Sequence, residues 1–118
     1  MREVVVVSAT RTPIGDFGGG LKDVSATSLA MAVIDSSIQR AGVEKRFVEQ
    51  VIMGNCFEPL DQNVARIAAV KCGLPLETPG FTIVVNCASA MQAIICGTQA
   101  IRDGDVDAVI AGGVESMS

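Results

Sequence analysis

The sequence predicts an α/β protein with a mostly parallel sheet and helices on both faces. Short apolar runs rich in β-branched residues alternate with segments of helical periodicity along the whole chain. This alternation implies right-handed crossovers between parallel strands. Hydrophobic residues make up 49% of the 118 residues and aromatic residues only 3%, so the core must be built from aliphatic side chains, as in buried parallel strands. The length suffices for one domain with its own core.

Four apolar runs are the expected strands, at residues 4–7, 51–55, 81–85 and 106–111. Between the first strand and the first helix lies the segment 11–20, which holds Pro13 and four glycines and is therefore expected to be an irregular loop.

Three helices are expected between these strands. Ser25 is a suitable N-cap for a helix over residues 26–41, and Gly42 is suited to the left-handed position that ends it. A second helix is predicted over residues 62–72. The third follows Cys87 and carries so few polar residues that we expect it to be buried on all sides.

Charge and composition exclude several classes of function. The net charge of −4 argues against binding to nucleic acid or to an anionic membrane surface. The chain has no apolar run long enough to span a membrane, and Met1 leads directly into the first predicted strand, so we expect neither a membrane protein nor a signal peptide. Four cysteines without metal-ligand spacing, and no histidine, predict no metal site. Thiols of this kind suggest a reducing compartment, and we expect a cytoplasmic protein.

Cys87 is the best candidate for a nucleophile. It stands where the predicted strand 81–85 passes into a helix, next to first-turn N–H groups that favour a thiolate. The alternative is that Cys87 is a small buried hydrophobic residue, the common fate of a free cysteine. From this stretch alone, both interpretations stay open.

Several blocks, taken in order along the chain, resemble those of one known family. These blocks are residues 11–19, 51–55, 62–66 with 73–75, 85–93, 100–105 and 111–118, and together they extend over essentially the whole 118-residue chain. On these blocks the chain resembles the N-terminal part of a thiolase, the family of acetyl-CoA C-acetyltransferases and 3-ketoacyl-CoA thiolases.

This resemblance implies a specific chemistry and a domain assignment. Residues 1–118 would form the N-terminal part of a thiolase-like catalytic domain, with the later parts of the family's chain absent. Cys87 stands at the position of the family's nucleophile, which accepts an acyl group from acyl-CoA and passes it on, so that a 3-ketoacyl-CoA is formed or cleaved. The implied substrates are acetyl-CoA and acyl-CoA, in fatty acid metabolism, with no covalently bound cofactor. The resemblance also implies a homo-oligomer, a dimer or tetramer, which fits the excess of apolar residues.

The sequence departs from the family in three respects. The family places two residues between an Asn and the nucleophilic Cys, whereas Asn86 and Cys87 are adjacent here, so we expect a shortened approach to the helix. The family usually has Gly where Ala90 stands. The family's histidine base and second catalytic cysteine are missing, and Cys56, Cys72 and Cys96 are expected to be structural. We therefore expect that this chain alone cannot complete the reaction.

Two other functions remain as alternatives. One is a decarboxylating condensing enzyme, similar to a ketoacyl synthase, which shares the fold and the nucleophilic cysteine. The other is a non-catalytic chain, either truncated or acting as an assembly partner, which the absent histidine and the adjacent Asn86 and Cys87 suggest.

Overall fold

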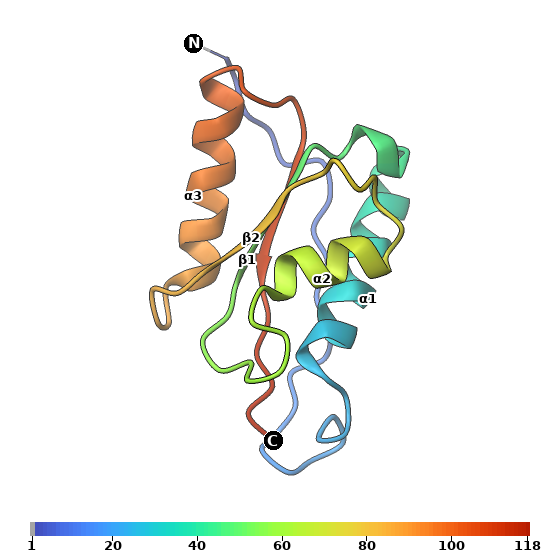
Figure 1. The fold of residues 1–118 in the computed structure, drawn as a ribbon, viewed down its shortest axis with the longest axis vertical. Coiled ribbons are helices and arrows are strands. Elements are labelled where there is room, and N and C mark those ends of the chain that lie inside the picture. The colour runs from blue at the N-terminus through green and yellow to red at the C-terminus, as the bar shows by residue number, and fades with distance from the viewer. Residues whose placement is uncertain (1) are drawn as a thin grey trace.

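The computed structural model, which describes residues 2–118, confirms the predicted fold class. Three parallel strands form one sheet in the order β2-β1-β3, so the first of them lies at the centre. Helix α3 lies on one side of the strands, and α1 and α2 lie on the other (Figure 1). The elements are α1 (Ala26–Ala41), the 3-10 helix η1 (Lys45–Phe47), β1 (Gln50–Gly54), α2 (Val64–Lys71), β2 (Gly80–Ile83), α3 (Ser89–Arg102) and β3 (Val109–Gly113).

The central strand β1 carries the core on both of its faces. Val51 and Met53 are buried in a cluster that α1 and α2 complete with residues such as Ile34 and Val64. Ile52 is also fully buried, and because side chains alternate along a strand, it points to the opposite face, toward α3. The apolar run thus reads as a strand covered on both sides.

The ends of α1 are set as the sequence predicts. The Ser25 hydroxyl accepts a hydrogen bond from the Ser28 N–H at 3.1 Å. At the other end Gly42 adopts a left-handed conformation with φ of 70°, which lets its N–H reach the last turn of the helix. Helix α2 begins two residues later than predicted, because Asn63 caps it by accepting a hydrogen bond from the Arg66 N–H.

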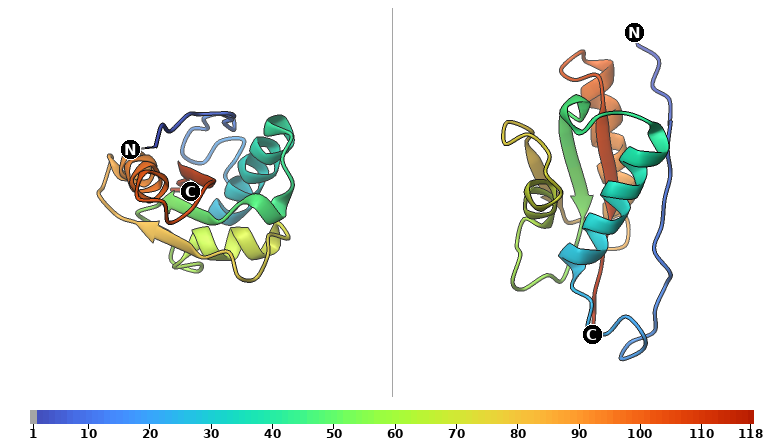
Figure 2. Two further views of the ribbon diagram at one scale, coloured as in Figure 1. Left: turned by 90° about the horizontal axis from the view of Figure 1, so that it is seen from above. Right: turned by 90° about the vertical axis from the view of Figure 1, so that its right-hand side faces the viewer.

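The prediction of a strand at residues 4–7 is wrong. This segment is in no strand, and Val5, Val6 and Val7 are 66%, 82% and 72% exposed. It runs lengthwise beside the rest of the molecule (Figure 2). It is held just before its start, where Arg2 donates a hydrogen bond to the Ile101 carbonyl, and just after its end, where the Thr10 hydroxyl donates one to the Val33 carbonyl. A β-branched run favours a strand only where a neighbouring strand offers a hydrogen-bonding edge. Within residues 2–118, β3 pairs with β1 alone.

The expectation that the third helix is buried on all sides is also wrong. In α3 only Ser89, Ala93 and Gly97 are buried, whereas Met91 is 61% exposed and Ile94 46% exposed. The helix packs on the three-stranded sheet through one face, and much of its remaining apolar surface, including Met91, is left exposed. The few polar residues of this helix therefore reflect two apolar faces, and only one of them is buried within residues 2–118.

Glycines let α3 lie directly on the sheet. A β-carbon at Gly54 would come within 2.5 Å of the Ser89 carbonyl carbon, and one at Gly113 would come within 2.7 Å of the Ala90 methyl group. A side chain of any kind at these positions would push the start of α3 away from the ends of β1 and β3. Ala90, which replaces the glycine usual in the family, has room for its methyl group because Gly113 has none.

We expect Gly54→Ala to destabilise the protein by about 1–3 kcal/mol, because the new methyl group overlaps the backbone at the start of α3. Gly112→Ala is the matched control, since a β-carbon there would lie 3.7 Å from the Met53 sulfur, an ordinary contact. Urea unfolding followed by circular dichroism measures both. Equal losses in the two variants would contradict the account of this contact.

Candidate active site

Cys87 lies on the turn between β2 and α3, at the carboxyl end of the sheet. Strand β2 ends at Ile83 and α3 begins at Ser89, so Cys87 is two residues before the helix. The side chain is exposed, which excludes the interpretation of Cys87 as a buried hydrophobic residue in this structure. Because the strands are parallel, β1 and β3 also end at this edge, and the segments that follow them begin there.

The first residue of α3 fixes this turn. The Ser89 hydroxyl accepts a hydrogen bond from the Val85 N–H at 2.8 Å and donates one to the Asn86 carbonyl oxygen at 2.7 Å. Asn86 has a φ of 50°, and among the residues described it is the one non-glycine residue in the left-handed region. Asn is one of the few residues that adopt this conformation readily. Ser89 is therefore more than a small residue that packs well, because its hydroxyl closes the turn that carries Cys87.

A carboxylate that sequence reasoning missed joins the ends of β1 and β3. Glu115 accepts hydrogen bonds from the backbone N–H groups of Cys56, at 2.6 Å, and Phe57, at 3.1 Å. Asn55 strengthens the link by donating from its side chain to the Val114 carbonyl at 2.8 Å. A charged acceptor on two backbone donors holds the loop firmly. The only feature of the sequence that could have pointed to Glu115 is that it is a single Glu in the block that begins with the glycines at the end of the last strand.

The remaining cysteines differ in environment. Cys72 is 4% exposed, and burial, aided by the charge of Asp35, raises the pKa of its thiol to about 11. Cys96 lies on α3, and its sulfur accepts a hydrogen bond from the Gln92 side chain at 3.6 Å. Cys56 is partly buried, and its sulfur lies 3.4 Å from the Asn86 carbonyl oxygen, against the turn of Cys87.

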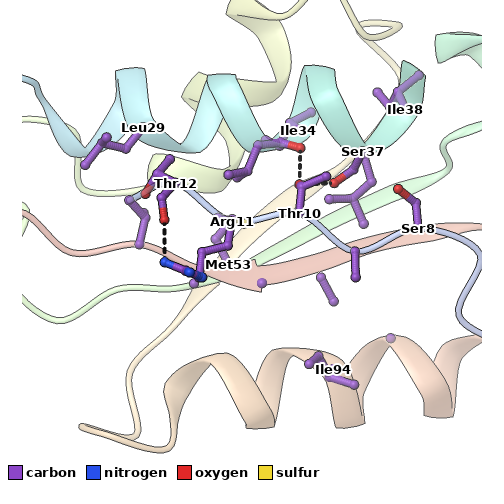
Figure 3. A pocket seen from close by; sticks show the side chains of 18 of the residues that line it. Ser8, Thr10, Arg11, Thr12, Leu29, Ile34, Ser37, Ile38, Met53 and Ile94 are labelled. Carbon is purple, nitrogen blue, oxygen red and sulfur yellow. Dashed lines mark hydrogen bonds between the residues drawn. The ribbon is translucent and has the colours of Figure 1, made fainter. Parts of the chain in front are cut away.

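A cavity of about 920 Å³ lies apart from this turn. It is enclosed by the N-terminal segment, α1, α3 and β3, and side chains of Thr10, Ile34 and Ile94 point into it from three directions (Figure 3). At its rim the Thr10 hydroxyl contacts that of Ser37 at 2.6 Å. Cys87 is not part of the lining. The cavity therefore lies between the N-terminal segment, which pairs with no strand within residues 2–118, and the rest of the molecule. It does not surround the candidate nucleophile.

Across residues 2–118, no three His, Cys, Asp or Glu side chains gather closely enough to hold a metal ion. None of the helices in this range has both the length and the apolar character needed to cross a membrane.

Comparison with known proteins identifies the family. Residues 4–118 match the model of the thiolase N-terminal domain. The chain belongs to the thiolase family. It is 44% identical over 117 residues to the acetyl-CoA acetyltransferase of Syntrophomonas wolfei, covering 98% of this chain and 30% of that protein. It is also 44% identical over 119 residues to the human mitochondrial acetyl-CoA acetyltransferase, covering 100% of this chain and 28% of the relative.

Solved thiolase structures agree in fold. The crystal structure of the Bacillus anthracis acetyl-CoA acetyltransferase matches with a TM-score of 0.89 and 43% identity, over 92% of this chain and 28% of that chain. The Acat5 thiolase from Ascaris suum, solved in complex with coenzyme A, matches with a TM-score of 0.88 and 37% identity, over 91% of this chain and 28% of that chain. This chain therefore spans about 30% of the length of the curated relatives it matches.

We expect Ser89→Ala to lower the free energy of unfolding by about 1–3 kcal/mol, because it removes the partner of the Val85 N–H and of the Asn86 carbonyl. Ser28→Ala, which removes an exposed hydroxyl on α1, should change stability by less than about 0.5 kcal/mol. Chemical unfolding of both variants measures the difference. Similar values for the two would show that the Ser89 hydroxyl does not hold the turn.

Iodoacetamide should alkylate Cys87 well before Cys72 in the folded protein. Cys87 is exposed, whereas Cys72 is buried and, with a pKa of about 11, stays mostly in the neutral, unreactive form from pH 8 to pH 10. Peptide mass spectrometry at increasing times gives the order, and labelling in urea should make the sites similar. Early labelling of Cys72 in the folded chain would contradict this assignment.

Proposed function

We propose that this chain carries the nucleophile of an acyl-CoA acetyltransferase of the thiolase type. The observation that carries the proposal is the exposed Cys87 on the turn that Ser89 closes, in a chain 44% identical to acetyl-CoA acetyltransferases. Residues 1–118 would be the N-terminal part of the catalytic domain. Acetyl-CoA and acyl-CoA are the proposed substrates, in fatty acid metabolism, and no covalently bound cofactor takes part.

The proposed reaction has two half-reactions at the Cys87 sulfur. In the first, the thiolate attacks the carbonyl carbon of an acyl-CoA, the bond from that carbon to the CoA sulfur breaks, and CoA leaves and takes up a proton. The enzyme now holds an acyl thioester on Cys87. In the second, this acyl group passes to CoA or to the carbanion of acetyl-CoA. Because a cysteine thioester and a CoA thioester are similar in energy, both steps run in either direction.

The general base for this chemistry would come from outside these 118 residues. The chain contains no histidine, and Cys72, its most buried cysteine, lies in the core cluster of α1 and α2 and not at the turn. The relatives are more than three times as long as this chain. We propose that the base and the second catalytic cysteine belong to a further part of the protein or to a complementing chain, and that residues 1–118 alone do not turn over.

The unusual approach to Cys87 is better explained by substitution than by deletion. The alignment with the human mitochondrial relative runs over 119 residues and covers 100% of this 118-residue chain, which leaves little room for two lost residues. Counting back from Cys87 with the family's spacing gives Val84 at the position of the family's Asn. Val84 is 63% exposed and follows the end of β2, so a polar side chain would fit there. We propose that Val84 replaces that Asn. Asn86 then occupies the second of the two positions between the family's Asn and Cys, and it does not correspond to the family's Asn.

Exposed apolar surface supports a protein that is larger or oligomeric. Met91, Ile94 and Ile95 on α3, together with Val6 and Val7, form apolar surface that a partner is expected to cover. A homo-oligomer, a dimer or tetramer, is the proposed assembly. The four free cysteines fit the reducing conditions of the cytoplasm, where we place the protein.

The two alternatives are less well supported. Relatives that match this chain include acetyl-CoA acetyltransferases and a β-ketothiolase, which favours thiolase chemistry over a decarboxylating condensing enzyme. The non-catalytic alternative applies to the isolated chain, since it has no histidine.

A chimaera tests the proposal. This chain would replace the matching 30% of the Syntrophomonas wolfei acetyl-CoA acetyltransferase, and CoA-dependent cleavage of a 3-ketoacyl-CoA would be measured. We expect an active chimaera in which Cys87→Ala lowers kcat by about 10³-fold or more, because the covalent route is lost. Cys96→Ala, on α3, is the matched control and should keep kcat within about fivefold, because Cys96 lies two helical turns from Ser89 and its sulfur accepts a hydrogen bond from Gln92 on the same helix.

A folded Cys87→Ala chimaera that keeps the activity of its parent would refute the role of Cys87. A loss of activity in Cys96→Ala equal to that in Cys87→Ala would also refute it, because the effect would then not depend on the nucleophile.

A further inference from the structure

The structure brings a second thiol against the turn of Cys87. Cys56 follows the end of β1, and its backbone N–H is held by Glu115 at 2.6 Å. Its sulfur lies 3.4 Å from the Asn86 carbonyl oxygen and 3.8 Å from the Ser89 hydroxyl. Asn86 and Ser89 flank Cys87 on either side, so the Cys56 thiol rests against the short segment that carries the candidate nucleophile.

These contacts limit the separation of the two cysteines. In a trans peptide, the carbonyl oxygen and the next α-carbon are about 2.8 Å apart. With the 3.4 Å contact to the Asn86 oxygen, the Cys56 sulfur is therefore no more than about 6 Å from the α-carbon of Cys87. In a disulfide, each sulfur lies roughly 4 Å from the α-carbon of the partner cysteine. The bound of about 6 Å therefore leaves a gap on the order of 2 Å, which a rotation of the exposed Cys87 side chain and a shift of the turn would close.

The other two cysteines lack this relation to Cys87. Cys72 is 4% exposed, and its sulfur donates a hydrogen bond to the Met31 carbonyl oxygen, on the side of the sheet that α1 covers. Cys96 lies seven residues after Ser89 along α3, two helical turns away from the Cys87 turn, and bonds Gln92.

We propose that Cys56 and Cys87 form a reversible disulfide when the protein meets a peroxide. The Cys87 thiolate attacks one peroxide oxygen, the O–O bond breaks, and Cys87 becomes a sulfenic acid while the second oxygen leaves as an alcohol or water. The Cys56 sulfur then attacks the sulfenic sulfur, the S–O bond breaks, and the hydroxyl leaves as water with the Cys56 proton. Two thiols are oxidised and one peroxide is reduced. A dithiol reverses the reaction by thiol–disulfide exchange.

This inference goes beyond the proposed acyl transfer and does not require it. While the disulfide is present, the Cys87 sulfur cannot attack a thioester. The disulfide also prevents oxidation of Cys87 to the sulfinic acid, a change that thiols do not reverse. Cys56 would thus protect the nucleophile. The expectation that Cys56 is only structural does not account for a thiol held against this turn by a fixed loop.

The 118-residue chain and its Cys56→Ser and Cys96→Ser variants test the proposal. Each protein would be treated at low micromolar concentration with a small excess of hydrogen peroxide, alkylated, and mapped by mass spectrometry without reduction. We expect a single intramolecular link between the peptides of Cys56 and Cys87 in the parent chain and in Cys96→Ser, and recovery of both thiols with dithiothreitol. In Cys56→Ser, Cys87 should instead accumulate as sulfinic acid.

Other outcomes overturn the proposal. Sulfinic acid at Cys87 to the same extent in the parent chain and in Cys56→Ser would show that Cys56 does not intercept the sulfenic acid. A predominant Cys87–Cys87 dimer, or a link from Cys87 to Cys96, would show that another thiol reacts first. Far-UV circular dichroism of Cys56→Ser verifies that the variant is folded, and a failure of acyl transfer in the chimaera would leave the disulfide result unchanged.

Discussion

The direct contact between the start of α3 and the ends of the strands is the constraint on which the rest of the structure depends. It exists because Gly54 and Gly113 present backbone without side chains to Ser89 and Ala90. The approach is so close that the carboxyl ends of β1 and β3 determine where the first turn of the helix lies. Cys87, two residues before the helix, is placed by this contact and not by the length of a flexible loop.

Polar groups then fix what the glycines bring together. The Ser89 hydroxyl closes the Cys87 turn, and the Glu115 carboxylate holds the loop that carries Cys56. Both act on backbone groups, so they determine where the segments lie and not only which side chains touch. The same arrangement explains why an exposed cysteine and a second thiol meet at one edge of the sheet.

The fold class followed from the sequence because each buried strand and each helix was encoded locally. The limits of α1 were predicted from Ser25 and Gly42, which act on their own helix ends. Residues 4–7 and the exposed face of α3 were predicted wrongly for a shared reason. An apolar segment carries the same signal whether its partner lies within these 118 residues or outside them.

The candidate site was predictable only in part. Cys87 was found because a strand-to-helix junction and a family resemblance both point to it. Glu115 and Cys56 were not, since they lie 28 residues after and 31 residues before Cys87 in the sequence, and only the parallel order of the strands places them at the same edge. The packing of Gly54 against Ser89 likewise depends on a register that no local pattern specifies.

The most direct test of the account is to trap the acyl group itself. The chimaera would be mixed with acetyl-CoA, quenched in acid within its first turnovers, and digested for mass spectrometry, since thioesters survive brief exposure to acid. The account predicts one acetyl group, bound as a hydroxylamine-sensitive thioester on Cys87 of this chain. Acetyl groups on Cys56 or Cys96 with Cys87 unmodified, or an active chimaera that shows no acyl-enzyme, would contradict it.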